Sequence, residues 1–206
     1  MLTIVQARLN SKRFPKKVLY KVNNKPLIYY LIKNLQKTKK KLKIIIATST
    51  KKTDDELVKY CIKNKIIFFR GKLNNVAHRL LSCAKKYKAK NFIRICADSP
   101  IIKPCIIDEM IKLYSKKKKY DLITNLFPRT FEKGQSIEII KTKILDCNLM
   151  KFDQNEKEHV TKFFYKNYKK FKIFNLKNKF KKTNIDYSVD TKKNLELLVR
   201  KNFFYD

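Results

Sequence analysis

A regular alternation of short apolar runs with amphipathic segments over the first 125 residues constrains the fold more than any other feature. The apolar runs predict buried strands at 2–6, 43–48, 66–69, 91–97 and 121–125. Between them, apolar residues at three- and four-residue spacing predict helices at 26–38, 53–64, 74–87 and 104–116. This alternation is typical of an α/β protein with a mostly parallel central sheet and helices on both faces.

Local signals refine the helix starts and the rest of the chain. Thr53 with Glu56 three residues later predicts a capping box, Asn74 predicts an N-cap, and Pro104 suits a first helical turn. Beyond residue 125 the pattern loosens, and it predicts a strand at 136–140, a helix at 156–168, a strand at 171–176 and a final helix from Thr191. We therefore expect one domain over residues 1–206, with residues 126–180 as an elaboration that serves as a lid or dimer contact.

The composition excludes several classes of protein. With 206 residues and 44% hydrophobic content, the chain can bury a core without disulfides or a structural metal. No apolar run approaches the roughly 18 residues of a membrane span, and no charged-then-apolar leader precedes the first strand, so we expect a cytoplasmic protein with no membrane segment. The cysteines are odd in number and form no Cys-x-x-Cys pair, which predicts buried free thiols at Cys61, Cys83, Cys96, Cys105 and Cys147.

A net charge of +34 points first to a nucleic-acid-binding protein. Only seven of the 51 basic residues are Arg, however, and the Lys residues are spread along the whole chain, as on a solvated surface. No recognisable nucleic-acid-binding motif accompanies them, so we expect no specific nucleic-acid partner. The few Arg residues are more informative, because guanidinium forms a rigid fork for phosphate or carboxylate.

The loop after the first strand, residues 7–17, has the composition of a polyphosphate site. In an open α/β sheet the ligand lies beyond the carboxyl ends of the strands, which segments 7–17, 48–54, 70–75 and 97–101 should reach. Arg8, Arg13 and Lys17, with backbone N–H groups, suit several phosphates at once. The loop lacks the Gly-Lys-Ser/Thr of a Walker loop, and a solvated basic turn is the alternative.

Two acidic residues are candidate metal ligands. Asp98 follows the strand at 91–97 and is placed to hold Mg²⁺ for a phosphate chain, or else to cap the turn before Pro100. Asp190 is either a second ligand or the N-cap of the final helix. His159 is either a catalytic group or a packing residue on its helix.

Eight motifs in order give the chain a resemblance to a known family. They are Gln-Ala-Arg-x-x-Ser-x-Arg-x-Pro-x-Lys from Gln6, then Ala-Thr-Ser, Phe-Arg-Gly, Arg-x-x-Ala-Asp-x-Pro, Asn-x-x-Pro-Arg-Thr-Phe, Gly-x-x-x-Glu, Glu-His-Val-Thr and Val-Asp-Thr. This order resembles the cytidylyltransferases of the spore coat polysaccharide biosynthesis type, which are related to the acylneuraminate and Kdo (3-deoxy-manno-octulosonate) cytidylyltransferases. The resemblance implies a Rossmann-like nucleotidyltransferase (nucleotide-diphospho-sugar transferase) fold. It also implies Mg²⁺-dependent transfer of CMP from CTP to a sugar or sugar acid, with release of pyrophosphate.

The resemblance also implies roles for individual residues. The catalytic group comprises Arg8, Lys17 and Asp98, and the metal ligands are Asp98 and Asp190. The nucleotide-binding set is Ala7, Arg8, Asn10, Ser11, Arg13, Lys17, Thr48, Arg70 and Arg94. The substrate-binding set is Arg129, Glu138 and His159, with residues 126–180 as the sugar-binding part. Dimers are common among the related enzymes, and a homodimer here is expected to use Phe163–Tyr165 as an apolar contact.

The chain departs from the family pattern at several positions. Asn10 and Lys16 stand where relatives have Gly, and Ser136 stands where they often have Asp. Asn75 and His78 replace acids. Asn tolerates the left-handed backbone conformation better than Lys does. Four alternatives therefore stay open: reduced or redirected activity, UTP as donor, GTP as donor, and a basic nucleic-acid-binding protein.

Overall fold

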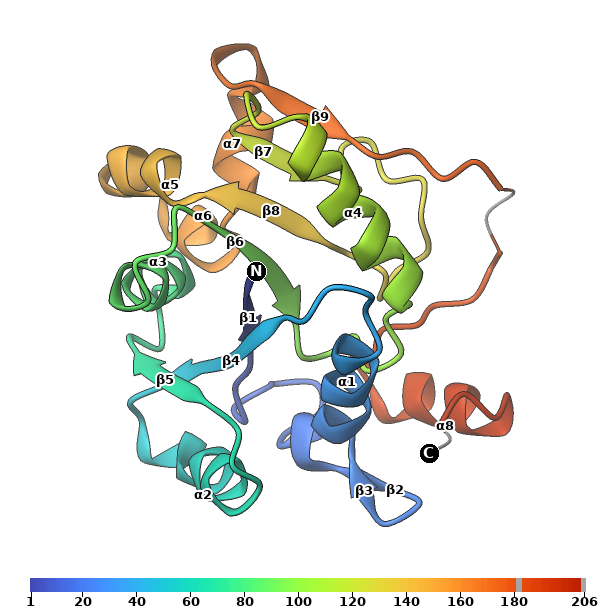
Figure 1. The fold of residues 1–206 in the computed structure, drawn as a ribbon. Coiled ribbons are helices and arrows are strands. Elements are labelled where there is room, and N and C mark those ends of the chain that lie inside the picture. Colours follow the sequence, from blue (N-terminus) through green and yellow to red (C-terminus); the bar gives the residue numbers. More distant parts are fainter. Residues whose placement is uncertain (181–182, 205–206) are drawn as a thin grey trace.

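A seven-stranded sheet crosses the molecule in the order β5-β4-β1-β6-β8-β7-β9 (Figure 1). The computed structural model describes residues 1–180 and 183–204. Strand β8 is antiparallel to β6 and β7, and the other neighbouring strands pair in parallel. This confirms the predicted α/β class. The strands are β1 (Leu2–Gln6), β4 (Lys43–Ser49), β5 (Phe68–Gly71), β6 (Asn91–Cys96), β7 (Leu122–Thr124), β8 (Glu138–Lys141) and β9 (Ile173–Asn175), with a separate hairpin of β2 (Lys21–Val22) and β3 (Lys25–Pro26).

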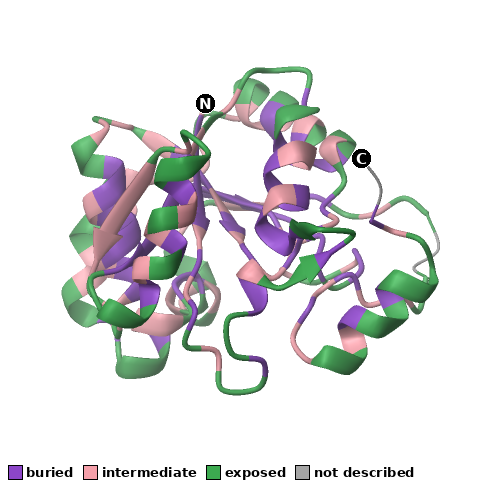
Figure 2. Ribbon diagram, turned by 90° about the horizontal axis from the view of Figure 1, so that it is seen from below, coloured by how far each residue is buried: buried purple, intermediate pink, exposed green. Residues whose placement is uncertain are grey.

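Helices cover both faces of the sheet because successive strand residues point to opposite sides. Ile4 packs in a cluster with helices on one face, and the next residue, Val5, packs in a different cluster on the other. The buried residues lie on the inner sides of these helices (Figure 2). One face carries α1 (Leu27–Gln36), α2 (Asp55–Lys63) and α4 (Pro104–Lys116). The other carries α3 (Val76–Lys86), α5 (Thr142–Asn148), α6 (Gln154–Glu158) and α7 (Lys162–Lys166).

The C-terminal segment returns to the first loop. A third apolar cluster joins Val189 and Leu195 to Phe14 and Leu27, so α8 (Lys192–Arg200) packs beside the loop and α1. Burial of these side chains holds the end of the chain in place. The contact brings residues near 190 to the carboxyl ends of β1 and β6, although they are far from the first loop in sequence.

Several predicted helix boundaries differ from the structure. The Thr53 capping box does not form, because a short 3-10 helix (Lys52–Asp54) precedes α2. The N-cap of α3 is Asn75 rather than Asn74, and its side chain accepts from the His78 N–H at 2.8 Å. The single helix predicted at 156–168 is divided into α6 and α7, with His159 as the C-cap of α6.

Two predictions about buried and exposed groups need correction. Cys105 and Cys147 are exposed, since they lie on the outer faces of α4 and α5, so only part of the cysteine prediction holds. The expected dimer contact at 163–165 is largely inside the chain, because Phe164 is fully buried and the Tyr165 hydroxyl bonds to Glu138 and Thr124. Within the described residues, no helix combines the length and apolarity needed to cross a membrane.

Candidate active site

A cavity of about 530 Å³ opens at the carboxyl ends of β1 and β6. Its walls come from the first loop, the start of α3, the end of β6, the end of α6 and the segment before α8. It therefore lies where the parallel-sheet topology predicts a ligand. Many of the residues that the sequence singled out line it, namely Ala7, Arg8, Asn10, Ser11, Arg13, Lys17, Arg94, Asp98, His159 and Asp190.

Four of the predicted site residues lie outside the cavity lining. Thr48 is buried in β4, and its hydroxyl has no partner among the residues described. The guanidinium of Arg70 donates to the backbone oxygens of residues 49 and 51 and pairs with Asp55 at 2.7 Å. Arg129 donates to Ser136 at 3.1 Å, and Glu138 lies behind Arg94. In this structure these side chains contact the protein rather than the cavity.

The first loop is fixed by hydrogen bonds to its backbone. The N–H of Lys16 donates to the carbonyl of Leu9 at 2.8 Å, and the N–H of Leu9 donates to the buried Asp54 carboxylate at 2.7 Å. Lys16 closes the loop with φ of 55°, in the left-handed region that favours glycine. Asn10 is not among the described residues with positive φ, so the position that needs this conformation is 16 rather than 10.

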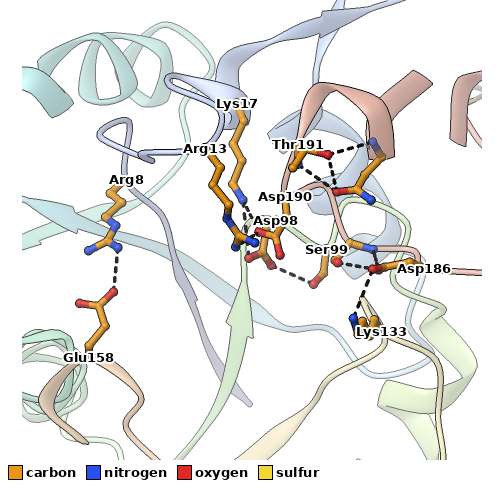
Figure 3. Close-up of polar contacts among 12 residues, drawn as sticks. Arg8, Arg13, Lys17, Asp98, Ser99, Lys133, Glu158, Asp186, Asp190 and Thr191 are labelled. Atoms are coloured by element: carbon orange, nitrogen blue, oxygen red, sulfur yellow. Dashed lines mark hydrogen bonds and ion pairs between the residues drawn. The ribbon is translucent and has the colours of Figure 1, made fainter. Parts of the chain in front are cut away.

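Opposite charges meet at the loop end of the cavity (Figure 3). The Lys17 ammonium lies 2.9 Å from Asp190 Oδ1 and 3.9 Å from Asp98 Oδ2, and Arg13 Nη2 lies 3.1 Å from Asp190 Oδ1. Burial raises the pKa of Asp98, and Lys17 only partly opposes the rise. Burial acts in the same direction on Asp190, but Lys17 and Arg13 outweigh it and hold the Asp190 pKa below its usual value. The two carboxylates thus differ in proton affinity while sharing one cation.

Asp190 is not the helix cap. The N-cap of α8 is Thr191, whose hydroxyl accepts from the Asn194 N–H at 3.2 Å while the Asn194 side chain accepts from the Thr191 N–H at 3.0 Å. This reciprocal capping leaves the Asp190 carboxylate to face Lys17 and Arg13. The alternative interpretation of Asp190 as a cap is therefore wrong.

The donor set fits a magnesium ion that is shared with phosphate. Groups of three or more protein side chains able to hold a metal do not occur in the described ranges, 1–180 and 183–204. Asp98 and Asp190 nevertheless offer two carboxylates that converge on one ammonium group. Mg²⁺ is commonly held by one or two carboxylates, with substrate phosphates and water completing its octahedron. These two residues match that requirement.

A second ion pair lies farther from the carboxylates, across the cavity. Arg8 Nη2 is 2.8 Å from Glu158 Oε1, and both side chains are about one-third exposed, at 37% and 32% (Figure 3). Glu158 is the last residue of α6, and His159 follows it at the cavity wall. The break between α6 and α7 therefore brings two polar side chains to the site.

Sequence reasoning missed several lining residues, including Gln6, Lys12, Asn74, Arg79 and Glu158. Arg79 carried a usable signal, since it is one of only seven Arg residues. It is 1% exposed, and Nη1 donates to the carbonyl of Lys72 at 2.7 Å. Burial lowers the pKa of Arg79 to about 10. Its side chain thereby supports the 72–74 loop from inside the protein.

A mostly parallel sheet with a charged cavity at this edge is the architecture of the nucleotidyltransferases that make nucleotide-diphospho-sugars. The family model described as cytidylyltransferase matches residues 2–203. The chain therefore belongs to the cytidylyltransferase family, and its relatives place it with the spore coat and Kdo types.

Relatives in sequence and structure agree with this assignment. The uncharacterized protein MJ1063 of Methanocaldococcus jannaschii is 30% identical, over all of this chain and 84% of its own length. The spore coat polysaccharide biosynthesis protein SpsF of Bacillus subtilis is 27% identical over 95% of this chain and 83% of its own. The solved cytidylyltransferase from Leptospira borgpetersenii superimposes with a TM-score of 0.92 at 27% identity, covering 100% of this chain and 88% of that one. A CMP:2-keto-3-deoxy-manno-octonic acid synthetase structure, at 15% identity, with 97% of this chain and 99% of that one covered and a TM-score of 0.72, shares the fold.

Proposed function

We propose that this protein transfers CMP from CTP to an oxygen of a sugar or sugar acid and releases pyrophosphate. The observation that carries the proposal is the meeting of Lys17 and Arg13 with Asp98 and Asp190 at the carboxyl edge of the sheet. Cations suited to a triphosphate and carboxylates suited to its metal lie within one cavity. Relatives named as 3-deoxy-manno-octulosonate cytidylyltransferases support CTP and a sugar acid as the class of substrates.

The proposed chemistry is a single in-line displacement. The acceptor oxygen attacks the α-phosphorus of CTP, the bond to the bridging oxygen of the β-phosphate breaks, and the acceptor proton leaves to solvent. Arg8, Arg13 and Lys17 bind the triphosphate and balance the charge that grows on pyrophosphate. Asp98 and Asp190 would hold Mg²⁺, which neutralises phosphate charge when bound. Most of the rate then comes from positioning and electrostatics.

The remaining proposed roles follow from position in the cavity. Backbone and side-chain groups of Ala7, Asn10 and Ser11 line the loop side, where they suit the nucleotide. His159 lines the opposite wall, where it suits the sugar. Thr48, Arg70 and Arg129 are outside the lining, and we propose that Arg70 and Thr48 support the site through β4 while Arg129 serves the acceptor from the 126–137 segment.

A thermal-shift comparison of CTP, UTP, GTP and ATP, each with and without Mg²⁺ at physiological salt, tests the donor. A ligand at a hundred times its dissociation constant adds about 2.7 kcal/mol of stability, which is readily measured. We expect CTP with Mg²⁺ to give the largest shift, and Asp98→Asn to remove the effect of Mg²⁺. Equal shifts from all four nucleotides, with no effect of Mg²⁺, would contradict the proposal and indicate a basic surface that binds any polyanion.

A second assay tests the reaction and the assembly. Pyrophosphate release from CTP should appear only when a sugar or sugar acid is added. Homodimerisation stays a prediction that light scattering can check.

A further inference from the structure

A row of polar side chains crosses the sheet beneath the cavity. Arg94 in β6 is in register with Glu138 in β8, which is in register with Thr124 in β7. In all three strands the residue two positions away on the same face, Phe92, Ile140 and Leu122, packs in the apolar cluster beneath α3, α5 and α7. The row is therefore a polar extension of an apolar face, at the end of the sheet nearest the cavity.

The charged members of the row are deeply buried. The side chains of Arg94 and Glu138 are 10% and 2% exposed and form a close ion pair. The second Glu138 oxygen accepts a hydrogen bond from Tyr165 at 2.7 Å, and the same hydroxyl is 2.8 Å from Thr124 Oγ1. Both carboxylate oxygens of Glu138 are thus used within the protein, and Glu138 is not part of the cavity lining.

Burying such a network costs folding free energy unless its geometry serves another purpose. A buried ion pair is often no more stabilising than apolar side chains of the same volume. Burial raises the pKa of Tyr165, and Glu138 raises it further, so the phenol keeps its proton and remains a donor. The network therefore holds one arrangement over the whole working pH range.

The arrangement fixes Arg94 from two sides. Its Nε donates to Gln6 Oε1 at 2.9 Å, and Nη1 pairs with Glu138. Within the part of the chain that the structure describes, Nη2 has only the weak acceptor Cys96 Sγ, at 3.8 Å. Since Arg94 lines the cavity, donors on a rigid planar fork are left for a ligand.

We infer that Arg94 binds an anionic oxygen of the substrate and that Glu138 and Tyr165 are positioning residues that aim its guanidinium. The inference rests on the proposed function and reassigns Glu138 from substrate contact to support. The anionic oxygen belongs either to a phosphate of the nucleotide or to a carboxylate of the acceptor, since a guanidinium binds both. Tyr165, which the sequence suggested as a dimer contact, is assigned to the site instead.

Matched pairs of probes test the inference. Dissociation constants are measured by calorimetry for CMP against cytidine, and for N-acetylneuraminate against its methyl ester. The proteins are the wild type, Arg94→Lys, Glu138→Gln, Tyr165→Phe and Tyr168→Phe. Tyr165→Phe keeps the ring that stacks on Phe127 at 4.8 Å, and Tyr168→Phe is its control, since Tyr168 is exposed and also contacts Phe127.

We expect Tyr165→Phe and Glu138→Gln to weaken binding of an anionic probe at least fivefold, with its neutral counterpart and the Tyr168→Phe protein unchanged. A loss confined to CMP identifies phosphate as the ligand, and a loss confined to N-acetylneuraminate identifies the carboxylate. A merely structural role would weaken both members of a pair equally. That outcome, or no change in either pair, would overturn the inference while wild-type binding of CTP leaves the proposed function standing. A wild type that bound no nucleotide would overturn both.

Discussion

The buried carboxylate of Asp54 accepts a hydrogen bond from the backbone N–H of Leu9 at 2.7 Å and thereby ties the first loop to the end of β4. Its other oxygen accepts from the N–H of Ser49 at 3.0 Å and from the Ser49 hydroxyl. One side chain thus holds two of the four segments that approach the cavity. The loop that carries Arg8, Arg13 and Lys17 is positioned from behind by a residue that does not line the cavity.

Asp54→Ala should therefore destabilise the fold and weaken nucleotide binding together. It leaves buried N–H groups without an acceptor, at about 1–3 kcal/mol each, so we expect the free energy of unfolding to fall by about 2–4 kcal/mol. Urea titration measures the loss. Asp55→Ala is the matched control, because Asp55 pairs with Arg70 at the surface and should change stability by less than about 1 kcal/mol. Equal effects of the two substitutions would contradict this role of Asp54.

Asp98→Asn should preserve the fold and reduce turnover by about 100-fold or more, since it removes a charge that the reaction needs near the phosphates. Pyrophosphate release at saturating CTP and Mg²⁺ gives the rate. Asp186→Asn serves as the control, because Asp186 lies close by, accepts from Ser188 at 2.6 Å and is not part of the lining. Near-normal turnover in Asp98→Asn would show that the metal assignment is wrong.

Glu158→Gln should strengthen CTP binding by about three- to fivefold. Arg8 pairs with Glu158 at 2.8 Å, and neutralising the carboxylate frees this guanidinium and removes a negative charge that repels triphosphate. Two unit charges about 4 Å apart in water interact by about 1 kcal/mol, which sets the size of the effect. Because both side chains are partly exposed, stability should change by less than about 1 kcal/mol. Calorimetric titration with CTP at two salt concentrations makes the comparison.

Glu196→Gln is the control for that experiment, since Glu196 lies on the exposed side of α8, away from the cavity. An affinity that rose equally in both variants would point to net charge alone, and an affinity that fell in Glu158→Gln would assign Glu158 to substrate binding.

The cysteines should divide into two classes toward iodoacetamide at pH 8. Cys105 and Cys147 are exposed and should be modified. Burial raises the pKa of Cys61, Cys83 and Cys96 to about 12, so these thiols stay protonated until the pH nears that value and remain unreactive in the folded protein. Intact-mass spectrometry should show two additions, and five only after denaturation. Early modification of Cys96, which lines the cavity, would contradict its protection.

The sequence by itself determined the elements whose signal is local. Apolar runs and helical periodicity located the core strands from β1 to β7 and the first four helices, because burial on a sheet or helix face imposes a fixed spacing on apolar residues. Motif order located the family and most of the cavity-lining residues. Where neighbouring signals competed, as at Thr53 and Asn74, the boundary moved by a residue or more.

Only the tertiary structure decided which of these residues meet. Packing of α8 beside the first loop brings Asp190 to Lys17, a pairing that no spacing in the chain implies. The insertion of β8 between β6 and β7 places Glu138 against Arg94 and under Tyr165, which changes their roles from substrate and dimer contacts to internal support. These contacts depend on strand order and on which helix covers which face. Because they arise from long-range burial rather than local propensity, the sequence pattern could name the residues but not join them.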